Sequence, residues 1–379
     1  MSVQTTTGVR YLLAGAVALT LATACDSSGG DGSEEPVHPK LGNFTVVAGN
    51  GTAGAPEDGK QAAEQPLRDI KDIAVDGTGA VYVAANCRAY RIGEDGAITA
   101  LYQQSDSFTI PPGQNRSSNR PSCVDTIAVD QAGTAYLGDE RSQTVWRISR
   151  DGRRDVVAGV GAGAEPVALK DTEGLPATQV PTSAPRSMVV TPDSKALFVV
   201  YAYQGGGVIR RVEIGGAISS VAGTGDGAGR SIRLTAPTPA RRTWIFGDGQ
   251  LADDGQGGLL VGNGQQLLRV RGDQVKPAGV SFDGKAGMVP SRSRLPYGVL
   301  KLAAAPDGSV YFTNFEEISR LAPDGSLGTV AALPAQRCDD GDPLPMQDVR
   351  GQGLAVHDGT LYVAYPQCNR VLSIAPPGS

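Results

Sequence analysis

The chain has 379 residues, of which 34 are Lys or Arg and 39 are Asp or Glu, and its formal net charge is −5 at pH 7. This mildly acidic balance excludes the strongly basic surface of a general nucleic-acid-binding protein. With two His, the chain cannot build a zinc site from several imidazole ligands, and its 51 Gly and 25 Pro indicate a fold with many turns.

The first 25 residues have the pattern of an export signal. One basic residue, Arg10, precedes an apolar run over residues 11–24 that is too short to span a bilayer with margin, and Cys25 follows directly. This arrangement resembles a bacterial lipoprotein signal, which implies cleavage before Cys25 and a diacylglycerol group on its thiol. An ordinary secretory signal and an uncleaved anchor are the alternatives.

A polar segment rich in Gly, Ser and Pro follows Cys25 and is typical of a flexible tether. We therefore expect residues 1–24 to be a lipoprotein signal peptide, residues 25–41 to be the lipidated Cys and its tether, and residues 42–379 to fold. Two or more acyl chains hold a protein stably on a bilayer. The expected location is the extracytoplasmic side of the cell membrane.

A unit of about 50 residues recurs along the rest of the chain. It contains an apolar strand, a turn rich in Asp and Gly, a second strand, a third strand with an Arg, a second Gly turn and an outer strand. Clear copies begin near residues 70, 124, 300 and 351, and looser copies begin near residues 186 and 250. Repeats of this length built from short strands predict a β-propeller.

The last copy stops at residues 375–379, where its fourth strand should begin. Residues 44–49 look like such a fourth strand but have no strands of their own before them. We expect this N-terminal strand to complete the last blade, which removes the open sheet edges. A stray edge strand is the alternative. The predicted fold is therefore all-β: a six-bladed β-propeller of four-stranded blades, with the last blade closed by residues 44–49.

Several short motifs carry a family resemblance. The sequence IAVD at residues 73–76, YVA at residues 82–84, the third strand with Arg and the V-A-G-x-G tail after the outer strand are similar to NHL repeats over residues 44–374. The resemblance implies a propeller but leaves the function open. NHL-like propellers include extracellular sensor domains, RNA- and protein-binding modules, and amidating lyases that need several His for zinc.

Four cysteines follow Cys25, and an even number in an exported chain predicts disulfides. In a propeller, the turns between second and third strands share one face with the linkers between blades. We call this the linker face, and we expect all four cysteines on it. Three connectivities exist for four cysteines; we favour the neighbouring pairs Cys87–Cys123 and Cys338–Cys368.

Second strands end in polar residues at matching positions, and we expect these near the mouth of the central channel. Their oxygen atoms could hold Ca²⁺, as in gluconolactonase-like propellers; alternatively, and in our interpretation more in keeping with the repeat, they fix the following turn by hydrogen bonds. These residues are Asn86, Asp139, Asn263 and Asn314.

Loops of the linker face also carry many Arg residues, which could contact an acidic wall polymer or an acidic protein, or could form a solvated rim. They are Arg116, Arg120, Arg230, Arg233, Arg241, Arg242, Arg292 and Arg294. We expect ligand contacts within residues 103–123, 223–249, 279–298 and 333–350, and not at the Asp-Gly turns of the opposite face.

These observations favour a membrane-tethered, extracytoplasmic binding, sensing or scaffold module without catalytic activity. We find no nucleophile elbow, phosphate loop or Ser-His-Asp set. The alternative is a lactonase-like hydrolase that depends on Ca²⁺, or a streptogramin-type lyase, with its site at the channel mouth. No other cofactor and no nucleic-acid partner are expected, and the sequence does not determine the oligomeric state.

The lipoprotein interpretation makes a direct prediction. A Cys25→Ser variant should lose its membrane anchor, because the modified thiol is absent. The expected outcome is release into the aqueous phase in a detergent-partition assay, with loss of the acyl groups seen by mass spectrometry. Equal partitioning of the variant and the parent protein would contradict the interpretation.

Overall fold

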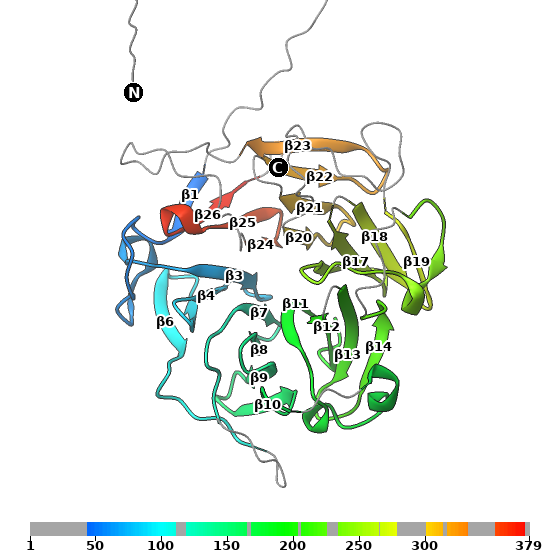
Figure 1. The fold of residues 1–379 in the computed structure, drawn as a ribbon. Coiled ribbons are helices and arrows are strands. Elements are labelled where there is room, and N and C mark those ends of the chain that lie inside the picture. Colours follow the sequence, from blue (N-terminus) through cyan, green and yellow to red (C-terminus); the bar gives the residue numbers. More distant parts are fainter. Residues whose placement is uncertain are drawn as a thin grey trace, which may run out of the picture. The chain divides into compact units, whose positions relative to one another are not determined.

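The computed structural model describes residues 44–110, 119–164, 168–203, 206–225, 234–264, 266–278, 301–313, 317–332 and 353–375. Within these ranges, antiparallel strands form six sheets that are arranged as the blades of a propeller (Figure 1). The described part of the chain has no helix with the length and apolarity that a membrane span requires. The predicted fold class is confirmed.

Blades 1 to 3 use the chain from residue 60 to residue 222, and the strands of each run from the centre outward. Blade 1 contains β3 (Ile70–Val75), β4 (Val81–Ala85), β5 (Arg88–Ile92) and β6 (Ala97–Tyr102), with β2 (Lys60–Gln61) on its outer edge. Blade 2 contains β7 (Thr126–Val129), β8 (Ala135–Asp139), β9 (Thr144–Ile148) and β10 (Arg154–Ala158). Blade 3 contains β11 (Ala184–Val190), β12 (Ala196–Tyr203), β13 (Gly206–Glu213) and β14 (Ile218–Ala222).

Blades 4 to 6 follow the same plan. Blade 4 contains β16 (Gln250–Asp253), β17 (Leu259–Asn263), β18 (Gln266–Arg271) and β19 (Gln274–Pro277), with β15 (Thr238–Pro239) on its outer edge. Blade 5 contains β20 (Lys301–Ala304), β21 (Val310–Thr313), β22 (Glu317–Leu321) and β23 (Leu327–Ala332). Blade 6 contains β24 (Leu354–His357), β25 (Thr360–Tyr365), β26 (Arg370–Ile374) and, as its outer strand, β1 (Phe44–Ala48).

The ring closes as the sequence predicts. Strand β1 pairs antiparallel with β26, with Phe44 opposite Ile374 and Ala48 opposite Val371. The strand stops one residue earlier than expected because Gly49 has a φ of +87° and leaves the extended conformation. At the centre, the inner strands β3, β7, β11, β16, β20 and β24 contact one another in sequence, and β24 contacts β3 again.

The hydrophobic core lies between the blades. Each large cluster combines side chains from two adjacent blades, because the two faces of every sheet are covered by its neighbours. Between blades 1 and 2, for example, Tyr102 and Trp146 lie in one cluster with Phe108 of the connecting segment, and the Phe108 and Trp146 rings meet edge to face at 5.0 Å. This packing explains the apolar alternation of the strands.

The Ala-Gly pair that ends several outer strands fastens the next linker. The glycine adopts a positive φ, and its N–H donates to the carbonyl oxygen of the first residue of a short 3₁₀ helix: η1 (Ala62–Glu64), η3 (Ala177–Gln179) or η4 (Ala240–Arg242). The donor and acceptor pairs are Gly49 with Ala62, Gly159 with Ala177, and Gly223 with Ala240. A Cβ on Gly223 would lie 2.3 Å from the carbonyl oxygen of Gly207 in β13. The position therefore requires glycine for two reasons, its φ and its space.

Replacing Gly223 by Ala should therefore lower the free energy of unfolding by more than the strained φ alone would. The Gly215→Ala variant is a matched control in the same blade, since Gly215 also has a positive φ but open space around it. We expect a loss of about 1 kcal/mol for Gly215→Ala and clearly more for Gly223→Ala, measured by urea unfolding. An equal loss at both positions would show that the close approach to Gly207 is unimportant.

Candidate functional site

The linker face is the face on which the sequence places a ligand. It carries the turns between second and third strands and the segments that connect one blade to the next. A disulfide joins these two kinds of segment: Cys87, in the turn after β4, is bonded to Cys123, which precedes β7, with their Cα atoms 4.1 Å apart. The predicted Cys87–Cys123 pair is confirmed, and it fixes the connection between blades 1 and 2 to blade 1.

For the second predicted disulfide, the structure describes one of the two cysteines. Cys368 lies buried in η5 (Pro366–Cys368), in the turn between β25 and β26, and is disulfide-bonded. Cys338 lies outside the described residues, so the pairing Cys338–Cys368 stays a prediction. The position of Cys368 in blade 6 corresponds to that of Cys87 in blade 1, as the repeat predicts.

The polar residues at the ends of second strands attach linkers to turns. Asp139 is fully buried; its carboxylate accepts hydrogen bonds from the Ser142 N–H at 3.0 Å in its own turn and from the Ser122 Oγ at 2.9 Å in the preceding linker. The Asn86 Oδ1 accepts a bond from the Arg68 Nε at 2.9 Å. Asp139 thus fixes the following turn, as the sequence suggested beside Ca²⁺ binding, whereas the Asn86 bond holds the preceding linker.

Asn263 has the same function in blade 4. Its Oδ1 accepts a hydrogen bond from the Phe246 N–H at 2.6 Å, and its Nδ2 donates to the Trp244 carbonyl oxygen at 3.3 Å. Asn314 lies outside the described residues. Within the described ranges, no group of three or more His, Cys, Asp and Glu side chains could hold a metal ion.

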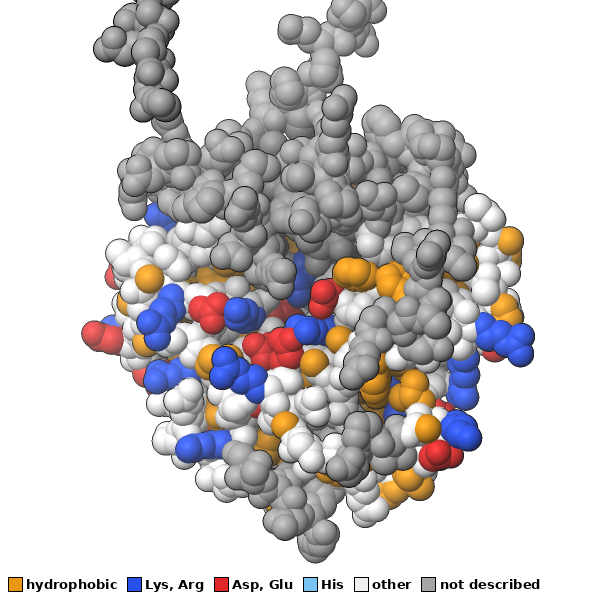
Figure 2. Space-filling model, in the orientation of Figure 1, with side chains coloured by type: hydrophobic (Ala, Val, Ile, Leu, Met, Phe, Trp, Pro, Cys, Tyr) orange, Lys and Arg blue, Asp and Glu red, His pale blue; other side chains and the backbone are white. Residues whose placement is uncertain are grey.

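Charged side chains lie around the beginning of the inner strands, a region that we call the mouth. Arg186 of β11 forms ion pairs with Glu140 of blade 2 and, at 3.3 Å, with the Asp248 Oδ1 just before blade 4. In Figure 2, acidic and basic side chains lie over the middle of the viewed face, where Figure 1 places the inner strands. Arg186 therefore connects three consecutive blades around the mouth.

A second ion pair lies deeper. The Lys301 Nζ of β20 is 3.2 Å from the Asp72 Oδ1 of β3, and each side chain is 11% exposed. The other Asp72 oxygen accepts a bond from the Thr126 Oγ1 of β7 at 2.6 Å. The Asp72 carboxylate thus connects blades 1, 2 and 5. The sequence signal was a charged residue within otherwise apolar inner strands, and our sequence analysis did not use it.

One carboxyl group at the mouth is shifted toward its neutral form. Burial raises the pKa of Asp125, and the nearby Glu140 and Asp139 raise it further, whereas the Glu140 N–H bond and Lys71 lower it. The Asp125 Oδ2 accepts that hydrogen bond at 3.0 Å. Asp125 is thus more easily protonated than an ordinary exposed Asp.

Of the predicted Arg residues, three lie in described segments. Arg120 is exposed in the segment between blades 1 and 2 and donates to the Gln104 carbonyl oxygen. Arg241 and Arg242 are exposed in η4, between blades 3 and 4. The remaining predicted residues lie outside the described ranges: Arg116, Arg230, Arg233, Arg292 and Arg294.

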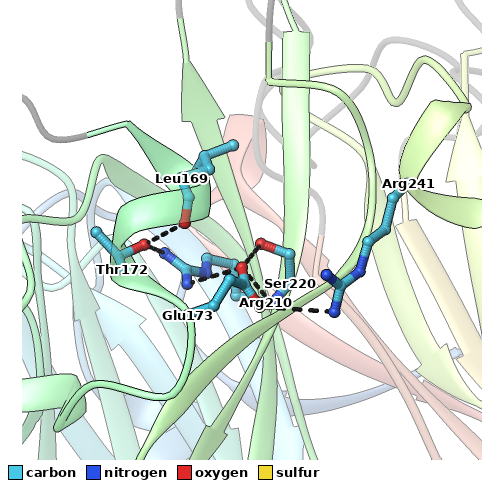
Figure 3. Close-up of polar contacts among 6 residues, drawn as sticks. All are labelled: Leu169, Thr172, Glu173, Arg210, Ser220 and Arg241. Atoms are coloured by element: carbon cyan, nitrogen blue, oxygen red, sulfur yellow. Dashed lines mark hydrogen bonds and ion pairs between the residues drawn. The ribbon is translucent and has the colours of Figure 1, made fainter.

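Arg241 belongs to a charge network that the sequence analysis missed (Figure 3). Glu173 follows η2 (Leu169–Thr172), in the segment between blades 2 and 3, and its carboxylate lies between two guanidinium groups. The Arg210 Nη2 is 3.4 Å from the Glu173 Oε1, and the Arg241 Nη2 is 3.5 Å from the Oε2. The Ser220 N–H also donates to the Oε2 at 3.0 Å.

Arg210 is fully buried and depends on this network. It occupies the position of β13 that corresponds to Trp146 in blade 2, where Trp146 pairs with Val156 and Arg210 pairs with Ser220. Its Nη1 donates to the Thr172 Oγ1 at 2.8 Å. A charge at a position that is apolar in another repeat was the signal available in the sequence.

The network keeps Glu173 ionised. Burial by itself would raise the pKa of Glu173, but the hydrogen bonds from Ser220 and the charges of Arg210 and Arg241 lower it below its ordinary value of 4.5. A lowered pKa in the folded state stabilises the protein above the ordinary pKa, and this stabilisation is lost as the pH falls through the lower value. The cluster of Glu173, Arg210 and Arg241 carries one net positive charge at neutral pH.

Comparisons with known proteins agree with the fold. No family model matches the chain. A stretch of 73 residues is 36% identical to part of Teneurin-m of Drosophila melanogaster, but it covers 19% of this chain and 2% of that protein. The chain therefore matches a very small part of this relative's length.

Two solved structures have the same architecture. An auxiliary nutrient binding protein from Bacteroides thetaiotaomicron superimposes with a TM-score of 0.53 and 10% identity, over 87% of this chain and 75% of that one. A gluconolactonase from Xanthomonas campestris superimposes with a TM-score of 0.51 and 12% identity, over 90% of this chain and 99% of that one. At these identities the likeness shows the propeller fold, and a binding protein and an enzyme both have it.

Loss of the Glu173 carboxylate should lower the stability of the protein considerably. Glu173→Gln removes the counter-charge of the buried Arg210, so we expect a loss of about 3 kcal/mol in the free energy of unfolding at pH 7. Glu213→Gln is the control in the same blade, because the pair of Glu213 with Arg211 is exposed and contributes about 0–1 kcal/mol. Urea unfolding at neutral pH measures both.

The same variant has a pH signature. The difference in the free energy of unfolding between the parent protein and Glu173→Gln should have its full size above pH 4.5. It should shrink as the pH falls through the lowered pKa of Glu173. A difference that stays constant down to the acid transition would show that the ionised carboxylate is not what stabilises Arg210.

Proposed function

We propose that this protein is a membrane-tethered, extracytoplasmic binding module, without catalytic activity, which binds an acidic ligand on its linker face. The predicted lipoprotein signal at Cys25 supports the location. The Cys87–Cys123 disulfide agrees with an oxidising compartment.

The observation that carries the proposal is the way in which this face is held in place. Three linkers are attached to the blades: one by the Cys87–Cys123 disulfide and by Asp139, one by Glu173 and one by Asn263. These attachments act together with buried linker side chains such as Phe108 and Ile245 to give each linker one conformation. A surface ordered before binding loses less entropy when the ligand arrives, which increases affinity.

The charge of the attached segments favours an anionic ligand. Arg242 stands next to Arg241 in η4, and it adds to the net positive charge of the cluster with Glu173 and Arg210. Within the described residues, no ion pair involves Arg242. A local positive patch on a protein of net charge −5 attracts and orients an acidic partner. We infer that the ligand is an acidic polymer of the cell wall or an acidic protein segment.

Hydrolysis of a lactone is the second candidate, and the specific observation in its favour is Asp125. A carboxyl group whose pKa is raised by burial is more readily protonated than an exposed one, as a general acid requires. The test is hydrolysis of gluconolactone by the purified folded domain, with and without added Ca²⁺. Turnover that is lost in Asp125→Asn would favour this candidate over the binding module.

Charge reversal on the linker face provides the test of the binding proposal. Arg242→Glu should weaken binding to immobilised polyglutamate and to immobilised polygalacturonate about tenfold, and more salt should weaken both further. Arg150→Glu makes the same charge change on another blade, since Arg150 is exposed in the turn between β9 and β10 of blade 2. Surface plasmon resonance at several salt concentrations measures both variants.

Two outcomes would contradict the proposal. One is an equal loss of binding for Arg150→Glu and Arg242→Glu, which would indicate attraction by the overall charge instead of a defined face. The other is unchanged binding for Arg242→Glu.

A further inference from the structure

Two aromatic rings, one exposed and one partly exposed, lie on the segment that connects blades 3 and 4. The Trp244 and Phe246 rings pack edge to face with their centroids 5.8 Å apart. Between them, Ile245 is fully buried, as expected for an extended segment whose successive side chains point in opposite directions. Phe246 is 43% exposed, and Trp244 is partly exposed. Phe246 therefore faces outward, Trp244 does so in part, and Ile245 secures the segment to the core.

The backbone beneath the two rings is fixed on both sides. Asn263 binds the Phe246 N–H and the Trp244 carbonyl oxygen, and the Gly207 N–H donates to the Ile245 carbonyl oxygen at 2.7 Å. Asn263 ends β17 and Gly207 lies in β13, so blades 4 and 3 both hold the segment. The rings are thus presented in a defined position before any ligand binds.

The exposure of Phe246 has no structural explanation in the described residues. Within them, the large apolar side chains that are well exposed are Val46, Leu175 and Phe246. Phe246 differs from the other two because a second aromatic ring lies against it. Exposed aromatic residues in a fixed arrangement are typical of a binding site.

Charged groups stand at both ends of the aromatic pair. On the side of η4, the exposed guanidinium groups of Arg241 and Arg242 precede Trp244 in the chain. On the side of the channel mouth, Asp248 forms its ion pair with Arg186. The segment thus begins with two basic side chains at the edge of blade 4, continues with two aromatic rings and ends at the mouth.

The composition of this surface favours a narrow ligand. A stable protein partner needs about 800 Å² on each side with an apolar centre, whereas the described part of this surface consists of one ring pair with two arginines beside it in the chain. A sugar polymer needs only ring faces for its C–H groups and donors for its polar groups. Guanidinium groups supply such donors in the geometry that suits carboxylate and sulfate or phosphate oxygens.

We propose that Trp244 and Phe246 form a stacking site for the pyranose rings of an acidic polysaccharide, and that Arg241 and Arg242 bind its anionic groups. This inference rests on the proposed binding function and specifies its ligand class. It gives Asn263 the role of a positioning residue for the two rings.

Intrinsic fluorescence gives a direct readout, because the chain has two Trp and the other, Trp146, is 1% exposed between blades 1 and 2. Oligogalacturonate and dextran sulfate are the acidic sugar probes. Neutral dextran tests the need for charge, and polyglutamate tests the need for a sugar ring. We expect a saturable change in Trp emission with the two acidic sugars and little change with dextran or polyglutamate.

Calorimetry with the same probes tests the residues. Trp244→Ala and Phe246→Ala should each raise the Kd for oligogalacturonate about tenfold, whereas Trp244→Phe keeps a ring and should stay within about threefold. Leu175→Ala, which removes another exposed apolar side chain, should bind like the parent protein. Circular dichroism melting confirms that each variant is folded.

The outcomes separate this site from the general binding proposal. If Trp244→Ala and Phe246→Ala bind both acidic sugars as tightly as the parent protein, the stacking site is wrong, even where Arg242→Glu still weakens binding. If polyglutamate binds as tightly as the acidic sugars, with the same loss in Arg242→Glu, the ligand is an acidic protein and the polysaccharide assignment is wrong. Absence of binding to both acidic sugars also overturns it.

Discussion

The hydrophobic core of this protein lies between neighbouring blades, so each blade depends on the two beside it. Trp146 of blade 2 is buried by residues of blade 1 and by Phe108 of the segment between them. Ala48 of the N-terminal strand lies in the cluster shared by blades 6 and 1. Closure of blade 6 by β1 therefore completes both a sheet and an interface, and the ring gains its stability from being closed.

Closure also determines what the linkers can do. Once the blades are fixed, each linker runs from the outer strand of one blade to the inner strand of the next and must be attached along the way. Ala-Gly pairs, a disulfide and buried polar side chains perform this attachment. Glu173 illustrates the principle: it neutralises the buried Arg210 and orders the exposed Arg241 with a single carboxylate. Stability and presentation of the proposed binding face thus depend on the same contacts.

The charged groups in the centre serve mainly to connect the blades. Arg186 bridges blades 2, 3 and 4, and Asp72 connects blades 1, 2 and 5. Because these side chains are paired with one another, the binding proposal places the ligand on the exposed residues of the linkers. Asp125 is the exception. Burial raises its pKa, and the Glu140 N–H bond and Lys71 offset this rise only in part.

The sequence by itself determined the repeat, the strand order within a blade and the closing strand, because period-two alternation, turn glycines and repeat length are local properties of the chain. It favoured the Cys87–Cys123 pair among three connectivities, and the structure decided it. It also identified the polar residues at the ends of the second strands, but it did not show which function each performs. Only the tertiary structure showed that Asn263 holds Trp244 and Phe246, and that Glu173 lies between Arg210 and Arg241. These contacts join separate segments of the chain, and they exist only when each linker folds back against a blade or a neighbouring linker.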